Sequence, residues 1–529
     1  CGWRDARKAQ TLAQRCGAGL RVRRLPIARV VGCGQISMEE ANESTPFGNG
    51  IEIPVVVGSG GRDVLAHAEL DLNEACQVAA KRDCAETQAQ HKDHVRAYCE
   101  SVRLGWNVIE SHCRVESCAF LSNVFLGAHA IIRDAYMVNT TVLSNAEEQS
   151  RVQAGADVRD ALLQWSVTVD SQSIVRNSLM CTQSHAEMHG KLLDSVLGPY
   201  SGVAEGEISE SLVGPFVGFH HQSLLIASFW PAGRGNIGYG ANVGSNHTGK
   251  APDQELWHGE GVFYGLGSCV KFPSDFSRAP YTLVATGITT LAQRMTCPFS
   301  LISSPQAHHG VQVASPAYNE IHPGWVLSQN LYSVIRNEYK FRDRGAKSKR
   351  VHIEFEILRP STVALLRVAR DDLARVHTRK AVYTDRDFAC IGKNIMTERS
   401  RAEAVSTYTR FILKFAAERL VSRLEKTPDM ALGVAEILRD ISSSATTPST
   451  YEEVEPMFDV TFTGAMASPT ALPDDWEHAK FILLNEAPSV VGIPKPELSQ
   501  WHGVARVLTW LRDTRDPWLP CRARLGRNG

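Results

Sequence analysis

The chain has 529 residues, of which 43% are hydrophobic and 21% charged, a composition typical of a folded protein with a sizeable buried core. Its 56 basic and 57 acidic residues give a formal net charge of -1, so the charge gives no reason to expect nucleic acid or an anionic membrane as a partner. The 13 cysteines form no CxxC pair, which predicts reduced thiols in a cytoplasmic protein rather than a disulfide framework. No apolar run approaches the ~20 residues of a membrane span.

Residues 1–104 are predicted to form a mixed α/β segment. The stretch IEIPVVVGSGGRDV (51–64) is typical of a strand followed by a glycine turn. A phosphate-binding loop is the alternative interpretation, but the Lys-Ser/Thr ending of such loops is missing. Residues 70–100 are rich in Ala, Glu, Gln and Lys and contain few breakers, which predicts helix.

A short phrase recurs after residue 105. It consists of an aliphatic residue, a variable residue, a third residue that is usually Asp, Asn, Glu or Ser, a small residue, and then one or two apolar residues. Successive copies begin 17, 26, 17, 17 and 16 residues apart, and the long interval contains an apparent inserted loop at 145–150. The six copies begin at Val115, Ile132, Val158, Val175, Leu192 and Ile208.

Self-similarity at a fixed period predicts a solenoid, and a period near 17 suits a triangular β-coil with three short strands per turn. We therefore predict a mainly β fold with a left-handed parallel β-helix over residues 105–304. The six aliphatic residues are expected to point inward and to stack on one another. The small residue is expected to let the backbone turn each corner, and the polar one to face outward or stack on its counterpart. An ordinary β-sandwich is the alternative, although sandwich strands do not share a phrase at constant spacing.

The remainder of the chain is predicted to be a C-terminal α-helical tail, with a strand and helices over 305–440 and a linker and irregular tail over 441–529. Apolar residues at 351, 353, 355 and 357 alternate with polar ones, which predicts a strand. Apolar faces at helical spacing predict helices over 361–376 and 405–424, packed against the β-helix or each other.

The segment Gly214–Lys250 is the strongest candidate for chemistry, because eight of its residues are glycine and it contains histidines and asparagines together. Imidazole acts as a general base near neutral pH, and asparagine amides hydrogen-bond ligand carbonyls or an oxyanion. The candidate catalytic residues are His220, His221 and His247. The candidate substrate-binding residues are Asn236, Asn242, Asn246 and, beyond the segment, His258.

Two other interpretations of this segment stay open. In the first, which is purely structural, the histidines and asparagines only hydrogen-bond backbone groups at the corners of the coil. In the second interpretation, the three catalytic candidates form a metal site. No diagnostic ligand spacing supports this interpretation, and no metal is assigned.

Several motifs together resemble an uncharacterised family of unknown function within the trimeric LpxA-like hexapeptide superfamily. They are FGNGIEIPVVVGSGGRDV (47–64), GPF followed by a histidine pair and LLIA (214–227), SNHTGK (245–250), GEGVFYGLGSCVKFPSDFSRAPYTLVATGITTL (259–291), RNEYK (336–340) and FAAERLVSRLE (415–425). The resemblance runs from roughly residue 15 to residue 490 and implies a left-handed β-helix and a trimer. It transfers no catalytic residue.

Relatives in that superfamily are mostly acyltransferases with one histidine base, or sugar nucleotidyltransferases with an extra domain whose glycine-rich signature this chain lacks. The resemblance therefore implies a transferase, with acyl transfer to a nucleotide sugar or another small activated molecule as the expected reaction. The expected partners are a small-molecule substrate such as a nucleotide sugar or acyl-CoA, with no nucleic acid and no membrane, and the cofactor is left unassigned. The alternatives are a non-catalytic β-helical assembly or ligand-binding protein, and a nucleotidyltransferase-related protein without its catalytic domain.

Overall fold

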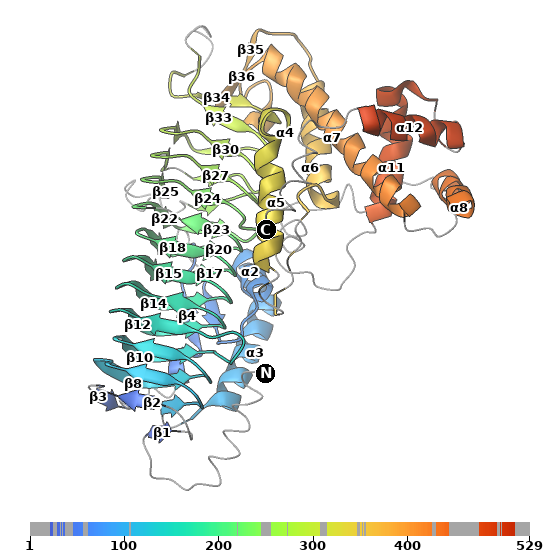
Figure 1. The fold of residues 1–529 in the computed structure, drawn as a ribbon. Coiled ribbons are helices and arrows are strands. Elements are labelled where there is room, and N and C mark those ends of the chain that lie inside the picture. Colours follow the sequence, from blue (N-terminus) through green and yellow to red (C-terminus); the bar gives the residue numbers. More distant parts are fainter. Residues whose placement is uncertain are drawn as a thin grey trace. The chain divides into compact units, whose positions relative to one another are not determined.

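The repeated phrase forms the coils of a parallel β-solenoid, as predicted, in the computed structural model of the chain (Figure 1). One coil consists of β15 (His185–Glu187), β16 (Lys191–Leu193) and β17 (Val196–Leu197). Each of these strands pairs in parallel with the corresponding strand of the next coil. The fold is therefore mainly β with C-terminal helices, and the left-handed sense of the coils stays a prediction.

The structure describes residues 46–56, 62–104, 107–219, 221–244, 255–271, 273–306, 315–345, 356–425, 430–443, 475–494 and 500–513, together with short pieces such as 22–24, 29–31 and 35–37. Most of the predicted linker and irregular tail over 441–529 lies outside these residues.

Two compact units divide the chain. The first comprises Cys1–Asp275, Val284–Gln293 and Gly345–His352, and the second comprises Phe276–Leu283, Arg294–Arg344 and Ile353–Gly529.

The first unit contains the coils and an α/β insertion. The insertion contains β4 (Ile51–Ile53), β5 (Val64–Ala66), α2 (Leu72–Ala80) and α3 (Ala85–Val102), and is preceded by β1 (Val22–Arg24), β2 (Arg29–Val31), β3 (Gln35–Ser37) and η1 (Pro46–Gly48). The coil strands before β15 are β6 (Asn107–Ile109), β7 (Arg114–Glu116), β8 (Phe120–Leu126), β9 (Ile131–Arg133), β10 (Tyr136–Val142), β11 (Arg151–Gln153), β12 (Asp157–Leu163), β13 (Thr168–Val169) and β14 (Ile174–Met180). Those after β17 are β18 (Gly202–Ala204), β19 (Glu207–Ser209), β20 (Leu212–Val213), β21 (Gly218–Phe219), β22 (Leu224–Ile226), β23 (Ser228–Trp230), β24 (Asn236–Ile237), β25 (Asn242–Val243), β26 (Leu256–Trp257), β27 (Phe263–Tyr264), β28 (Cys269–Val270), β29 (Ser274–Asp275) and β31 (Thr289–Thr290).

Stacked aliphatic side chains fill the inside of the coils. All six phrase-initial residues are fully buried, as predicted. They form two ladders rather than one. Val158, Val175, Leu192 and Ile208 pair in register along one side of the coil. Val115 and Ile132 belong to another side, on which Ile132 pairs with Val152 of the next coil. The interval of 26 residues therefore contains a change of side as well as the inserted loop.

The corner after each phrase-initial strand is turned by the polar residue of the phrase, and not by the small one as predicted. The third residue of every copy has a left-handed backbone, with φ between 44° at Asn177 and 55° at Ser117. Asn and Asp tolerate this conformation better than other non-glycine residues, which explains their recurrence. The polar residues also stack, since the Asn177 amide donates to Asp194 Oδ1 at 2.7 Å.

The small residue after each corner points inward and is buried. From Ser178 onward the serines of successive coils form a ladder: the backbone N–H groups of Ser195, Ser211 and Ser228 each donate to the hydroxyl of the serine one coil earlier, over 3.0–3.2 Å. Each of these hydroxyls in turn donates to a carbonyl two residues before it, as Ser195 does to Leu193. The small residue therefore satisfies backbone groups that the corner leaves unpaired.

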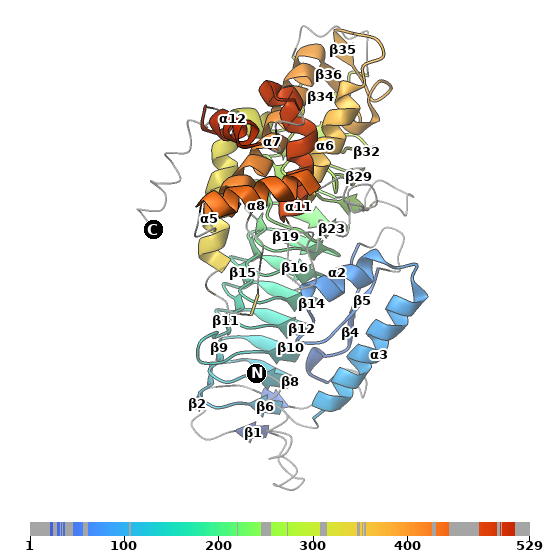
Figure 2. The ribbon, with the colours of Figure 1, turned by 90° about the vertical axis from the view of Figure 1, so that its right-hand side faces the viewer.

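The insertion packs on the flank of the early coils (Figure 2). β4 and β5 form an antiparallel hairpin, and the two helices confirm the helical prediction for residues 70–100. Asp71 caps α2 by accepting the backbone N–H of Asn73 at 2.7 Å. The Gln164 amide, on the coil after β12, donates to the carbonyls of Ala68 and Leu70 and so holds the start of α2 in place.

The second unit contains the helical tail. Its elements are β33 (Leu301–Ser303), β34 (Asn319–His322), α4 (Trp325–Gln329), α5 (Leu331–Gly345, whose last residue belongs to the first unit), α6 (Pro360–Ala374), β35 (Val382–Tyr383), η2 (Ala389–Ile391), β36 (Asn394–Thr397), α7 (Glu398–Glu425), α8 (Met430–Ser443), α11 (Asp475–Ala487), η3 (Pro488–Gly492) and α12 (Trp501–Asp513).

Both predicted tail helices are present, as α6 and α7, and they pack on each other. Leu366 on α6 and Phe415 on α7 are buried, and the Tyr408 hydroxyl donates to the Pro298 carbonyl at 2.6 Å. The strand predicted over 351–357 is wrong for the residues described there. Ile353 and Ile357 are buried, but the Ile357 N–H donates to the Glu338 carboxylate at 2.9 Å instead of to a neighbouring strand.

Among the helices described, none combines the length and the apolar composition that crossing a bilayer requires.

Candidate functional site

A histidine–carboxylate pair lies at one corner of the solenoid. His221 follows β21, and Glu205 occupies the matching corner one coil earlier, where it has a φ of 53°. The Gln222 N–H donates to the Glu205 carbonyl at 2.6 Å, which fixes the two corners on top of each other. Nδ1–H of His221 donates to Glu205 Oε2 at 2.6 Å.

This pair has the geometry of a base with an orienting acid. A carboxylate only accepts, so the bond places the proton on Nδ1 and the lone pair of a neutral His221 ring on Nε2. The side chains of His221 and Glu205 are 58% and 40% exposed, so a molecule in solvent has access to both. A proton arriving at Nε2 would be stabilised by the adjacent carboxylate.

The other candidate site residues of the segment Gly214–Lys250 do not all lie on one side of the coil, and some lie outside the described residues. Asn236 lies on β24 and Asn242 on β25, which belong to different sides of the coil. Oδ1 of Asn242 is buried and has no hydrogen-bond partner within the described part of the chain. His220, Asn246 and His247 lie outside the described residues, so the structure does not place them beside His221.

His258 lies in the interior of the solenoid. Its Nδ1 shares a 2.6 Å hydrogen bond with the Tyr264 hydroxyl, and its ring packs 4.9 Å from that of Trp230. Burial lowers the pKa of His258 to about 3, so the ring is neutral. The neighbouring Arg234 and Glu260 form a buried ion pair at 2.7 Å. These contacts place His258 in a buried polar cluster rather than on a solvent-facing surface.

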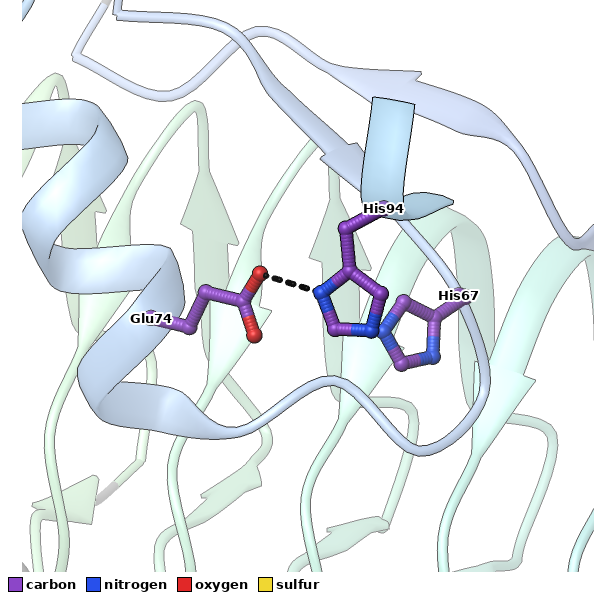
Figure 3. A group of neighbouring side chains, drawn as sticks. All are labelled: His67, Glu74 and His94. Carbon is purple, nitrogen blue, oxygen red and sulfur yellow. Dashed lines mark hydrogen bonds and ion pairs between the residues drawn. The ribbon is translucent and has the colours of Figure 1, made fainter. Parts of the chain in front are cut away.

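A second histidine–carboxylate cluster, which the sequence interpretation missed, lies in the insertion (Figure 3). His67 follows β5, Glu74 lies on α2 and His94 on α3. One ligand atom from each of the three side chains lies within 4.8 Å of the others. The sequence feature that could have indicated this cluster is the spacing of His91 and His94 in HKDH, since residues three apart lie on one face of a helix.

Comparison with family models matches residues 24–377 to a family described as "Domain of unknown function (DUF4954)". The match is shorter than the resemblance over residues 15–490, and includes both histidine–carboxylate clusters. A relative from Treponema pallidum (strain Nichols), called "Uncharacterized protein", is 24% identical over 307 residues. That alignment covers 58% of this chain and 41% of the relative, so the chain corresponds to less than half of that protein.

Proposed function

The chain belongs to the family described as Domain of unknown function (DUF4954), and we propose that it is a transferase of the hexapeptide-repeat kind. In this proposal it transfers an acyl group from an acyl-CoA to a nucleotide sugar or another small activated molecule. His221 is the general base and Glu205 holds its ring in the reactive tautomer.

The observation that supports the proposal is the 2.6 Å bond from His221 Nδ1 to Glu205 across two stacked corners. A general base needs a partner that stabilises the protonated ring, and Glu205 is that partner in this proposal. A base near neutral pH contributes typically 10²–10⁴-fold to a proton-transfer step. Asn242, whose buried carbonyl oxygen is unsatisfied within the described residues, is the proposed positioning amide for the acceptor. His220 and His247 remain alternative bases.

The superfamily resemblance supports the same proposal. Transferases with one histidine base are built on left-handed β-helices, and this chain has a parallel β-solenoid. The left-handed sense, the LpxA-like membership and the trimer are parts of the proposal.

A non-catalytic assembly is the second candidate, and one observation favours it. Met188, Tyr239 and Leu266 have exposed fractions of 50%, 52% and 51%, and lie at the corner that carries His221. The stacking is visible in the backbone, since Gly240 donates to the His221 carbonyl and Gly267 to the Tyr239 carbonyl. Large apolar side chains aligned on a surface are typical of an interface, here with a second copy of the chain.

Donor binding and product formation distinguish the two candidates. Thermal unfolding of the purified chain would be followed with acetyl-CoA, with nucleotide sugars and without ligand. Unheated mixtures of the chain, acetyl-CoA and a nucleotide sugar would be analysed by mass spectrometry for acetylated nucleotide sugar. A donor at a hundredfold excess over its Kd stabilises the native state by about 2.7 kcal/mol. The proposal predicts such stabilisation together with an acetylated acceptor and the release of free CoA. Formation of UTP and a sugar 1-phosphate from a UDP-sugar and added pyrophosphate, without acyl transfer, would favour nucleotidyl chemistry. The absence of stabilisation by every donor would contradict the proposal.

A further inference from the structure

The insertion carries a cluster of imidazoles and one carboxylate that the proposed transferase does not use. The His94 ring lies between the Glu74 carboxylate and the His67 ring (Figure 3). The hairpin that ends at β5 and the two helices position the three residues, so the cluster depends on the tertiary packing of the insertion.

His67 is the buried member of the cluster. The residue is only 4% exposed, and its ring packs 4.1 Å from the ring of Tyr98. Nδ1 accepts a long hydrogen bond from the Glu69 N–H at 3.3 Å, while Nε2 has no partner within the described residues. Burial lowers the pKa of His67 to about 4, so the ring is neutral at pH 7. A buried imidazole nitrogen without a partner is unfavourable unless something binds to it.

Glu74 is the anionic member. Its Oε1 accepts from Nδ1 of His91 at 2.9 Å and from Nδ1 of His94 at 3.1 Å. The bond from His91 and the charges of the two rings lower the pKa of the Glu74 carboxyl, although burial opposes them. His91 also contacts the Leu65 carbonyl through Nε2 at 2.7 Å, so it fixes the carboxylate to the end of the hairpin. Carboxylates and imidazoles that are held by such outer contacts are typical of metal sites.

We propose that His67, Glu74 and His94 bind one divalent transition-metal ion, with Zn²⁺ as the preferred ion. Two imidazoles and a carboxylate form a common three-ligand set for Zn²⁺, and the fourth position is left for water. Ca²⁺ and Mg²⁺ prefer oxygen ligands and are therefore disfavoured by the imidazoles.

Binding requires a small rearrangement. Ligand atoms in a tetrahedral zinc site lie roughly 3.3 Å apart, from bond lengths of about 2.0–2.1 Å, so atoms spread over as much as 4.8 Å must approach each other. The metal displaces any proton from Nε2 of His67, and the ring then carries its proton on Nδ1 and gives up the long Glu69 bond. The His94 side chain is 55% exposed, so the ion has access from solvent and the His94 ring has room to move.

Metal titration of the whole chain tests the site. The chain would be dialysed against EDTA, and Zn²⁺ would be titrated in competition with a chromophoric chelator. Co²⁺ serves as a second probe, since its visible spectrum reports ligand number. The matched variants are His94→Ala and Glu74→Gln, with His189→Ala as the control, since His189 is an exposed histidine on a coil corner. His94 is exposed enough that its loss leaves the fold intact, which melting without metal verifies.

We expect the wild type and His189→Ala to bind one tight Zn²⁺ per chain. Each ligand variant should weaken that binding by about 100-fold or more, and His91→Gln by about 10-fold, because outer contacts are worth 10–100-fold in metal affinity. Equal Zn²⁺ affinity in the wild type, His94→Ala and Glu74→Gln would overturn the site, and so would the absence of Zn²⁺, Co²⁺ and Mn²⁺ binding by the wild type.

Discussion

Replacing Leu192 with alanine tests whether stacked aliphatic side chains hold the coils together. Leu192 is 0% exposed and lies in register between Val175 and Ile208. The substitution removes three carbon atoms, each worth about 0.8 kcal/mol when buried. The cavity left between the coils adds to this loss, so we expect destabilisation by about 2–5 kcal/mol.

The neighbouring Leu193 is the matched control. It has the same side chain and lies on the same strand, but its side chain points to the outer face and is half-buried. Leu193→Ala should therefore destabilise by less than about 1 kcal/mol, since little apolar surface returns to water. Urea unfolding followed by circular dichroism measures both variants, and amide hydrogen exchange shows whether the loss is local to the neighbouring coils. Equal destabilisation by the two substitutions would refute the inward-facing ladder.

Three other predictions follow from the buried residues. The folded-state pKa of His258 is depressed to about 3, below the 6.5 of the unfolded chain, so its contribution to stability is complete above pH 6.5 and is lost as the pH falls toward 3. Between pH 7 and pH 5 this amounts to about 2 kcal/mol in urea unfolding, and His258→Gln should abolish that part; an unchanged pH dependence would contradict a neutral buried ring. Leu366→Asp on α6 should destabilise the second unit by several kcal/mol, whereas Val368→Asp, at a residue 39% exposed, should have little effect on its thermal unfolding. Arg234→Met leaves the Glu260 carboxylate buried without its ion-pair partner and should destabilise by about 3–5 kcal/mol, and adding Glu260→Met should recover much of this loss; a double variant as unstable as the single one would argue against that origin.

The solenoid could be predicted because its constraint repeats. Each coil needs an inward aliphatic residue and a residue that tolerates positive φ at the corner. Both residue types therefore recur in the sequence at nearly constant spacing. The side of the coil could not be predicted, because different corners have the same requirement. Asp134 and Asp160 both have a φ of 48°, yet Asp134 follows β9 and Asp160 lies within β12, and these two strands belong to different sides of the coil. The phrase therefore aligned Ile132 with Val158, although Ile132 stacks on Val152.

The candidate sites were less predictable, because they depend on contacts between separate elements. His221 was predicted from the glycine-rich segment, but its partner Glu205 lies 16 residues earlier and is brought close only by coil stacking. The cluster of His67, Glu74 and His94 joins a hairpin end to two helices, and only the histidine spacing within α3 was visible in the sequence. The strand predicted over 351–357 failed for a similar reason, since the Ile357 N–H donates to Glu338 on α5 and the residues described there have no β partner in the described part of the chain.

The rate of group transfer by His221→Ala, measured together with the affinity for the donor, tests whether His221 is the general base. We expect the variant to bind the donor as the wild type does but to transfer the group about 10²–10⁴-fold more slowly, because it has lost its general base. His189→Ala, at an exposed histidine on a neighbouring coil corner, should keep the wild-type rate. A wild-type transfer rate in His221→Ala, with unchanged donor affinity and unchanged melting temperature, would show that His221 is not the general base.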